Sequence, residues 1–165
     1  MDFRRRRHGR ARARPGANWD QEIGAIAELS YRSAHPKALL FDSIGDYRSG
    51  LRILTGSTGS ALRLGRTLRL GDNFDDPGLV AALRGKPSRW AAASADFPTL
   101  TVDTAPFMEN VVDGDEVNLL EFPVPMWHEL DGGRFIGTGC FVTTTDTGKV
   151  NGGCCRMQVQ DEGGS

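Results

Sequence analysis

The chain has 165 residues, of which 39% are apolar and 25% are charged, with a formal net charge of −1. This balance is typical of an ordinary globular protein, and the length fits one domain or one small domain with part of another. The apolar runs are far shorter than the roughly 20 residues of a membrane-spanning helix, and no apolar signal-peptide core follows the N-terminus.

The N-terminus is the most unusual segment in composition. Residues 1–14 hold seven arginines and one acid, Asp2, a net charge of +6, so the remaining 151 residues carry −7. Three interpretations stay open: an arginine-rich arm for nucleic acid or anionic surfaces, a disordered tail without a role, or an out-of-frame translation of GC-rich DNA. The acidic remainder of the chain argues against a nucleic-acid-binding domain.

The first half of the chain predicts alternating helices and strands. A helix is expected over 18–33, capped by Asn18 or Asp20, because its apolar side chains recur at the three-and-four spacing of one face. That face comprises Ile23, Ile26, Ala27 and Ser30. Apolar runs at 37–45 and 49–56 predict two buried strands. Helices are then expected over 61–71, ending at Gly71, and from a proline-led turn at 75–77 to about residue 84. This pattern indicates an α/β domain.

The last third predicts β-structure. A proline- and threonine-rich connector leads into two strand-like runs, 135–145 and 154–160, with Asp146 and Gly148 suited to a tight hairpin between them. We therefore expect an α/β fold followed by the first strands of a barrel or sandwich. The expected divisions are a basic tail or frame artefact at 1–16, an α/β domain at 17–90, a connector at 91–116 and a β-rich domain from 117 to 165.

The stretch Asn-Gly-Gly-Cys-Cys-Arg at 151–156 is the main candidate site. On an extended strand Cys154 and Arg156 share one face and Cys155 the other. Asn151 offers an oxygen ligand suited to a hard divalent ion, and Arg156 can grip a carboxylate or phosphate with two hydrogen bonds. The alternative interpretation is that this stretch has no functional role. It would then be a plain hairpin turn followed by a solvent-facing arginine and two buried cysteines. An odd number of cysteines, two of them adjacent, does not indicate a disulfide framework, which favours the cytoplasm.

A second cluster precedes that stretch. His128, Glu129 and Asp131 could serve acid–base chemistry. The simpler interpretation is that Asp131-Gly132-Gly133 forms a turn whose backbone is held by an acidic side chain, and we favour it.

The segment FPVPMWHELDGGRFIGTGCFVTTTDTGKVNGGCCRMQV resembles the start of the cofactor-binding domain of the UbiD family of decarboxylases. The family pattern includes a Pro-x-Pro segment, Asp-Gly-Gly before an aromatic residue, a Thr-Gly turn and an Asn-x-Gly run before an arginine. Upstream, WDQEIGAIAELSYRSAHPKALLFDSIGDY resembles the family's N-terminal α/β domain. The resemblance extends from about Asn18 to Glu162 and is most specific over 121–159.

This resemblance implies reversible, non-oxidative decarboxylation of an aromatic or α,β-unsaturated carboxylic acid with prenylated FMN. It also implies a split β-barrel flavin domain, with Mn²⁺ and K⁺ beside the cofactor phosphate. By the motif, Asn151 would be a metal ligand and Arg156 the arginine of a catalytic Glu-Arg-Glu set. The backbone of the four residues between them would line the cofactor: Gly152, Gly153, Cys154 and Cys155. Cys155 replaces the tyrosine or other larger residue usual in the family, and Cys154 a small or aliphatic one.

The family's remaining metal ligands, catalytic glutamates and oligomerisation domain are expected beyond residue 165. The chain by itself is therefore expected to be inactive. A flavin prenyltransferase would supply the cofactor, and the complete protein is expected to be a homo-oligomer without a membrane or nucleic-acid partner. The alternative is a non-catalytic subunit that assembles with a separate chain carrying the glutamates.

Overall fold

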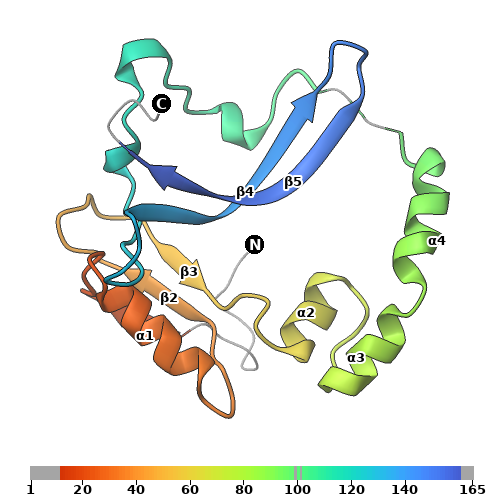
Figure 1. Cartoon of the computed structure of the whole chain (residues 1–165), viewed down its shortest axis with the longest axis horizontal. Coiled ribbons are helices and arrows are strands. Elements are labelled where there is room, and N and C mark those ends of the chain that lie inside the picture. The colour runs from red at the N-terminus through yellow and green to blue at the C-terminus, as the bar shows by residue number, and fades with distance from the viewer. Residues whose placement is uncertain (1–11, 99, 101, 161–165) are drawn as a thin grey trace. The chain divides into compact units, whose positions relative to one another are not determined.

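The computed structural model describes residues 12–98, 100 and 102–160 (Figure 1). The chain divides into two compact units, one joining Met1–Gly56 to Asp115–Ser165 and the other formed by Ser57–Gly114. The architecture is mixed α/β, as expected from the sequence. The four divisions predicted from the sequence remain predictions, and most of the arginine-rich segment lies outside the described residues.

A three-stranded sheet forms the base of the first unit. Its order is β1 (Arg12–Pro15), β2 (Leu39–Asp42) and β3 (Ile53–Thr55), with β1 parallel to β2 and β2 antiparallel to β3. A parallel pair needs a crossover connection, and helix α1 (Glu22–Tyr31) provides it. The strands at 39–42 and 53–55 confirm the two predicted strands, but β3 is only partly buried, since Leu54 is 48% exposed. Residues 12–15, assigned to the basic tail from the sequence, instead form an edge strand.

The core of this unit lies between α1 and the sheet. Ile23 and Phe41 are fully buried, and Ala17, Leu39 and Ile44 complete the buried cluster. The predicted apolar face of the helix is confirmed, because Ile23 and Ala27 are buried and Ile26 packs against the same cluster. The alternation along β2, buried at Leu39 and Phe41 and half-buried between them, follows the two-residue period of a strand.

The predicted cap of α1 is wrong in detail. Gln21 occupies the N-cap position with a left-handed φ of 62° and makes no side-chain cap hydrogen bond. The Asn18 side chain instead accepts a hydrogen bond from the Asp20 backbone N–H at 2.9 Å, which shapes the turn before the helix.

A distant segment holds this turn in place. The Met126 backbone N–H donates to the Trp19 carbonyl at 3.1 Å, and the Gln21 N–H donates to the Met126 carbonyl at 2.9 Å. Trp127 packs against the core beside them. Gly24 of α1 is buried there, and a Cβ at this position would lie 1.8 Å from the Trp127 carbonyl oxygen. The close approach of helix and segment therefore requires glycine.

The predicted hairpin is confirmed. Strands β4 (Arg134–Thr144) and β5 (Val150–Val159) pair antiparallel, with a register shift between Ile136 and Gly139 (Figure 1). Gly148 adopts a left-handed φ of 78° in the connecting turn, and its N–H donates to the Thr145 carbonyl at 2.8 Å.

The second unit is helical. It contains α2 (Ala61–Thr67), α3 (Asp76–Leu83) and α4 (Lys86–Ala92), and the 3-10 turns Ala93–Asp96 and Pro106–Met108 lie in the predicted connector. Ser60 and Asp75 cap α2 and α3 by accepting backbone N–H bonds at 3.3 and 2.8 Å. Helix α2 ends at Thr67, earlier than the predicted end at Gly71, and α4 was not predicted. Two further 3-10 turns, Gly114–Glu116 and Leu119–Glu121, lead back towards β4.

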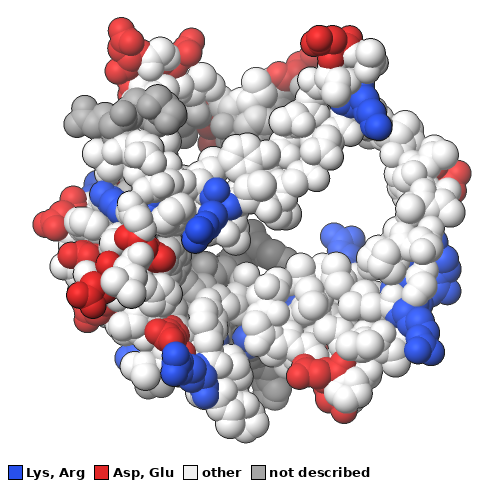
Figure 2. Space-filling model, in the orientation of Figure 1, with Lys and Arg blue, Asp and Glu red and all other residues white. Residues whose placement is uncertain are grey.

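The described surface carries charges of both signs. On the face drawn in Figure 2, lysine and arginine side chains lie among aspartates and glutamates, without a continuous basic face. Across the described ranges, no helix combines the length and hydropathy that crossing a membrane requires.

Candidate functional site

Strand β5 carries the residues that the sequence singles out at 151–156. Its partner β4 places Thr143 opposite Asn151, Cys140 opposite Cys154 and Gly139 opposite Cys155. The extra residue that shifts the register lies on β4, so the alternation of side chains along β5 is uninterrupted.

Arg156 lies on an exposed part of this hairpin. Its guanidinium carbon is 4.7 Å from the centroid of the Phe135 ring. Phe135 pairs with Gln158, two residues beyond Arg156 on the same face of β5. This distance allows a cation–π contact between the guanidinium and the ring.

The hairpin does not bring all the predicted site residues to one face. Alternation places Gly152, Cys154 and Arg156 on one side of β5, and Asn151, Gly153 and Cys155 on the other. Asn151 and Arg156 are five residues apart, or about 17 Å along a strand. Any ligand that reaches both must be elongated and must pass the edge of β5.

The two glycines leave that route free of side chains. A Cβ added at Gly152 or Gly153 would meet no other atom within 4 Å. Asn151, Cys154 and Cys155 are exposed, so the alternative reading of the two cysteines as buried apolar residues is wrong. Within the described part of the chain, no three histidine, cysteine or acidic side chains are grouped to hold a metal ion.

The turn before β4 is fixed by side chains on both sides of it. The Asp131 carboxylate accepts a hydrogen bond from the His128 backbone N–H at 3.1 Å, which confirms the structural interpretation of Asp131-Gly132-Gly133. The Gln158 side chain donates to the Gly132 carbonyl at 2.7 Å. Gln158 therefore positions the turn and is not a free amide beside Arg156.

Arg134 anchors the start of β4 to the core of the first unit. Its Nε donates to the Val124 carbonyl at 2.7 Å, and its terminal nitrogen donates to the Tyr47 hydroxyl. The guanidinium also lies 4.2 Å from the centroid of the Trp19 ring. Arg134 was not predicted as an anchor, and its place directly after Asp-Gly-Gly was the available signal in the sequence.

Replacing Arg134 with lysine is expected to lower the free energy of unfolding by about 2 kcal/mol, because a single ammonium cannot bond to both partners and stack on the ring. Urea unfolding of the 165-residue chain measures this. Tyr47→Phe, which removes only the hydroxyl, should cost about 1 kcal/mol. An Arg134→Lys midpoint equal to that of the unchanged chain would contradict this anchoring role.

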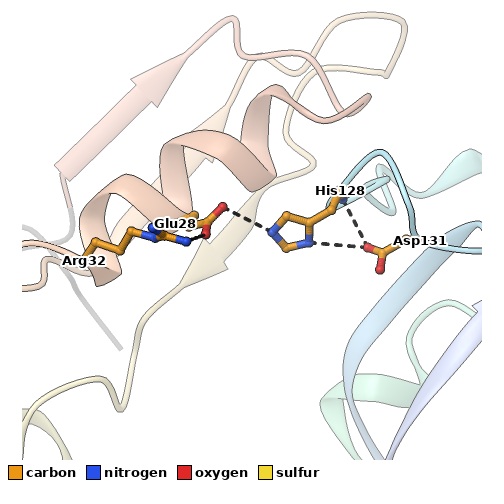
Figure 3. A network of polar contacts seen from close by, with 4 residues as sticks. All are labelled: Glu28, Arg32, His128 and Asp131. Atoms are coloured by element: carbon orange, nitrogen blue, oxygen red, sulfur yellow. Dashed lines mark hydrogen bonds and ion pairs between the residues drawn. The ribbon is translucent and has the colours of Figure 1, made fainter.

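His128 lies between two carboxylates (Figure 3). Its Nε2 is 3.6 Å from a Glu28 oxygen on α1, and its Nδ1 is 3.6 Å from an Asp131 oxygen. Glu28 also pairs with Arg32 one turn further along the helix. Arg32 and His128 are exposed and the two carboxylates are half-buried, so each of these contacts near the surface stabilises little. The network links α1 to the turn before β4, and Glu129 takes no part in it.

Sequence comparisons match parts of this chain to known proteins. Residues 99–164 match the family model described as the 3-octaprenyl-4-hydroxybenzoate carboxy-lyase Rift-related domain of UbiD. A pyrrole-2-carboxylic acid decarboxylase of Pseudomonas aeruginosa is 37% identical over 135 residues, which cover 77% of this chain and 26% of that protein.

Solved structures of the vanillic acid decarboxylase of Sedimentibacter hydroxybenzoicus share the fold. An open form superposes with a TM-score of 0.72 and 26% identity over 93% of this chain and 32% of that one. The closed form gives a TM-score of 0.73 at 24% identity, over 92% of this chain and 32% of that one.

These matches relate the chain, over part of its relatives' length, to a family of carboxy-lyases. The resemblance predicted from the sequence is confirmed: the chain is related to the UbiD-family decarboxylases, and residues 99–164 match the model of that family's Rift-related domain. It spans about a quarter of the curated relative and a third of the solved chains.

Proposed function

We propose that this chain is the N-terminal part of a decarboxylase that removes the carboxyl group from an aromatic or α,β-unsaturated acid, reversibly and without net oxidation, using prenylated FMN. The observation that carries the proposal is the β4–β5 hairpin with its exposed Asn-Gly-Gly-Cys-Cys-Arg strand, within a segment that matches the UbiD domain. We assign the hairpin to the first strands of the split β-barrel and the protein to the cytoplasm.

The residues of β5 fit an elongated cofactor with a phosphate at one end and a ring at the other. Asn151, near the turn, would offer its amide oxygen to a Mn²⁺ ion on the phosphate, with K⁺ nearby. Gly152 and Gly153 admit a ligand against the backbone because neither has a side chain. A single oxygen ligand does not hold a divalent ion, so the other ligands must come from residues beyond this segment.

Arg156 would bind the substrate carboxylate near the reacting ring. Its planar guanidinium matches a carboxylate with two parallel hydrogen bonds, and Phe135 fixes the orientation of that plane. When bound, the prenylated flavin would supply the electron-accepting ring that this chemistry needs. The part of this chain is to orient the carboxylate and to provide positive charge where it leaves.

The test is to produce this segment within a chain of the length of its relatives, together with a flavin prenyltransferase. Release of CO₂ from pyrrole-2-carboxylate, vanillate and related unsaturated acids is then measured with and without the prenyltransferase. Cofactor-dependent CO₂ release would support the proposal. A folded, flavin-loaded protein that releases none from any aromatic or unsaturated acid would overturn it. Release that requires a second, separately encoded chain would favour the subunit alternative.

A further inference from the structure

Two of the three cysteines face each other across the β4–β5 hairpin. Cys140 and Cys154 are direct register partners, and all three thiols are free and exposed. Directly opposed residues of an antiparallel pair place their side chains on the same face of the sheet. The pairing depends on the shift between Ile136 and Gly139, because without the extra residue Cys140 would oppose a different position.

The pairing geometry is compatible with a covalent bond. Opposed residues in an antiparallel ladder have Cα atoms about 4.5 or 5.5 Å apart, depending on the type of pair. A disulfide requires a Cα separation of about 4.4–6.8 Å. Both types of pair fall within this Cα range, and the Cβ atoms of opposed residues, about 4.5–5.5 Å apart, need to approach by no more than about 1–2 Å to reach the roughly 3.5–4.5 Å of a disulfide.

Cys155 is excluded from this pair by alternation. Its side chain lies on the opposite face of β5, and its register partner is Gly139, which has no side chain. Cys154 and Cys155 are neighbours in sequence, so an unstructured chain would not distinguish them as partners for Cys140. A preference of Cys140 for Cys154 over Cys155 would therefore show that the hairpin is folded with this register.

We infer that Cys140 and Cys154 form a reversible disulfide with low-molecular-weight disulfides as the oxidant. One thiolate attacks the small disulfide, displaces one thiolate and forms a mixed disulfide. The opposing cysteine then attacks the protein sulfur and displaces the second small thiol. The two protein thiols lose two protons and two electrons, and the small disulfide is reduced to two thiols. The bond would join β4 to β5 beside Arg156, which shares the face of Cys154.

The experiment uses the reduced 165-residue chain equilibrated with oxidised glutathione, quenched with acid and alkylated. The number of alkylated thiols should fall from the three free cysteines to one. Trypsin cleavage after Arg134, Lys149 and Arg156 separates Cys140 from the other two cysteines. Tandem mass spectrometry of the cross-linked peptides should find the remaining alkyl group on Cys155.

Matched variants sharpen the result. Cys155→Ser should leave the rate of the Cys140–Cys154 cross-link unchanged. In Cys154→Ser only Cys155 remains as a partner for Cys140, and that link should form at least about tenfold more slowly, because effective concentration favours opposed groups. The same oxidation in urea should link Cys140 to either neighbour equally. Equal linkage of Cys154 and Cys155 in the native chain, or full alkylation of Cys140 after oxidation, would overturn the inference.

Discussion

Gly24→Ala is expected to lower the free energy of unfolding by about 3 kcal/mol, the upper part of the usual range for overpacking a buried site. The new Cβ would lie 1.8 Å from the Trp127 carbonyl oxygen and 2.9 Å from its Cα, both backbone atoms. Either α1 or the 122–127 segment must move, and both are held by the hydrogen bonds between Met126 and the turn at residues 19–21.

Intrinsic propensity predicts the opposite sign, since alanine in a helix interior is favoured over glycine by about 1 kcal/mol. Urea or thermal unfolding of the 165-residue chain distinguishes the two. Gly45→Ala is the matched control, because a Cβ there meets nothing within 4 Å, and it should be close to neutral. An increase in stability with Gly24→Ala would show that the segment does not pack on α1 as described.

Arg156→Ala, in a chain extended to the length of its relatives, is expected to reduce turnover by about 10²–10³-fold or more, the usual loss when a charge-stabilising donor is removed. Its urea midpoint should change little, because the side chain is exposed and its described ring contact is with Phe135 alone. The measurement is kcat for CO₂ release together with the unfolding curve.

Two control variants test whether the loss of turnover comes from the hydrogen-bonding geometry of Arg156 or only from the removal of a positive charge. Arg156→Lys retains the charge but not the two-pronged hydrogen bonding, so only part of the activity should survive. Arg52→Ala removes an exposed arginine before β3 and should leave turnover unchanged. Wild-type kcat with Arg156→Ala would remove this residue from the chemistry while leaving the assignment of the domain intact.

Local sequence patterns predicted the elements whose formation depends on their own residues. The stripe of Ile23, Ile26 and Ala27 predicted α1, and the apolar run at 37–45 predicted β2. Gly148 in the turn after Thr144 predicted the hairpin. In each case one amphipathic face or one turn residue carries enough information to define the element.

Features that depend on distant residues were not predicted. The basic composition of residues 12–15 indicates a tail, and only pairing with β2 makes them a strand. The anchor at Arg134 depends on Trp19 and Tyr47, which are far away in sequence. No local pattern reveals that Gly24 is buried against Trp127. From the sequence alone, a single glycine in a helix indicates only a lower helix propensity.

The residues of the candidate site stay predictions, and the structure shows how strand β5 arranges them. Alternation correctly separates Arg156 from Cys155, and it equally separates Arg156 from Asn151. The sequence motif shows that these residues are close along the chain, but it does not show which face of the strand each side chain lies on. The pairing of Cys140 with Cys154 required the register of β4, which an irregularity shifts by one residue.

The first unit is interrupted in the chain by the second, and this discontinuity has a kinetic consequence. The contact between Arg134 and Tyr47 spans 87 residues, and closing such a loop costs about 4 kcal/mol in chain entropy. Contacts of this range slow folding. At a synthesis rate of about 5–20 residues per second, the ribosome needs roughly 4–17 s to add that length. During this interval Trp19 and the adjoining face of α1 stay uncovered, because the segment that packs on them has not yet been synthesised.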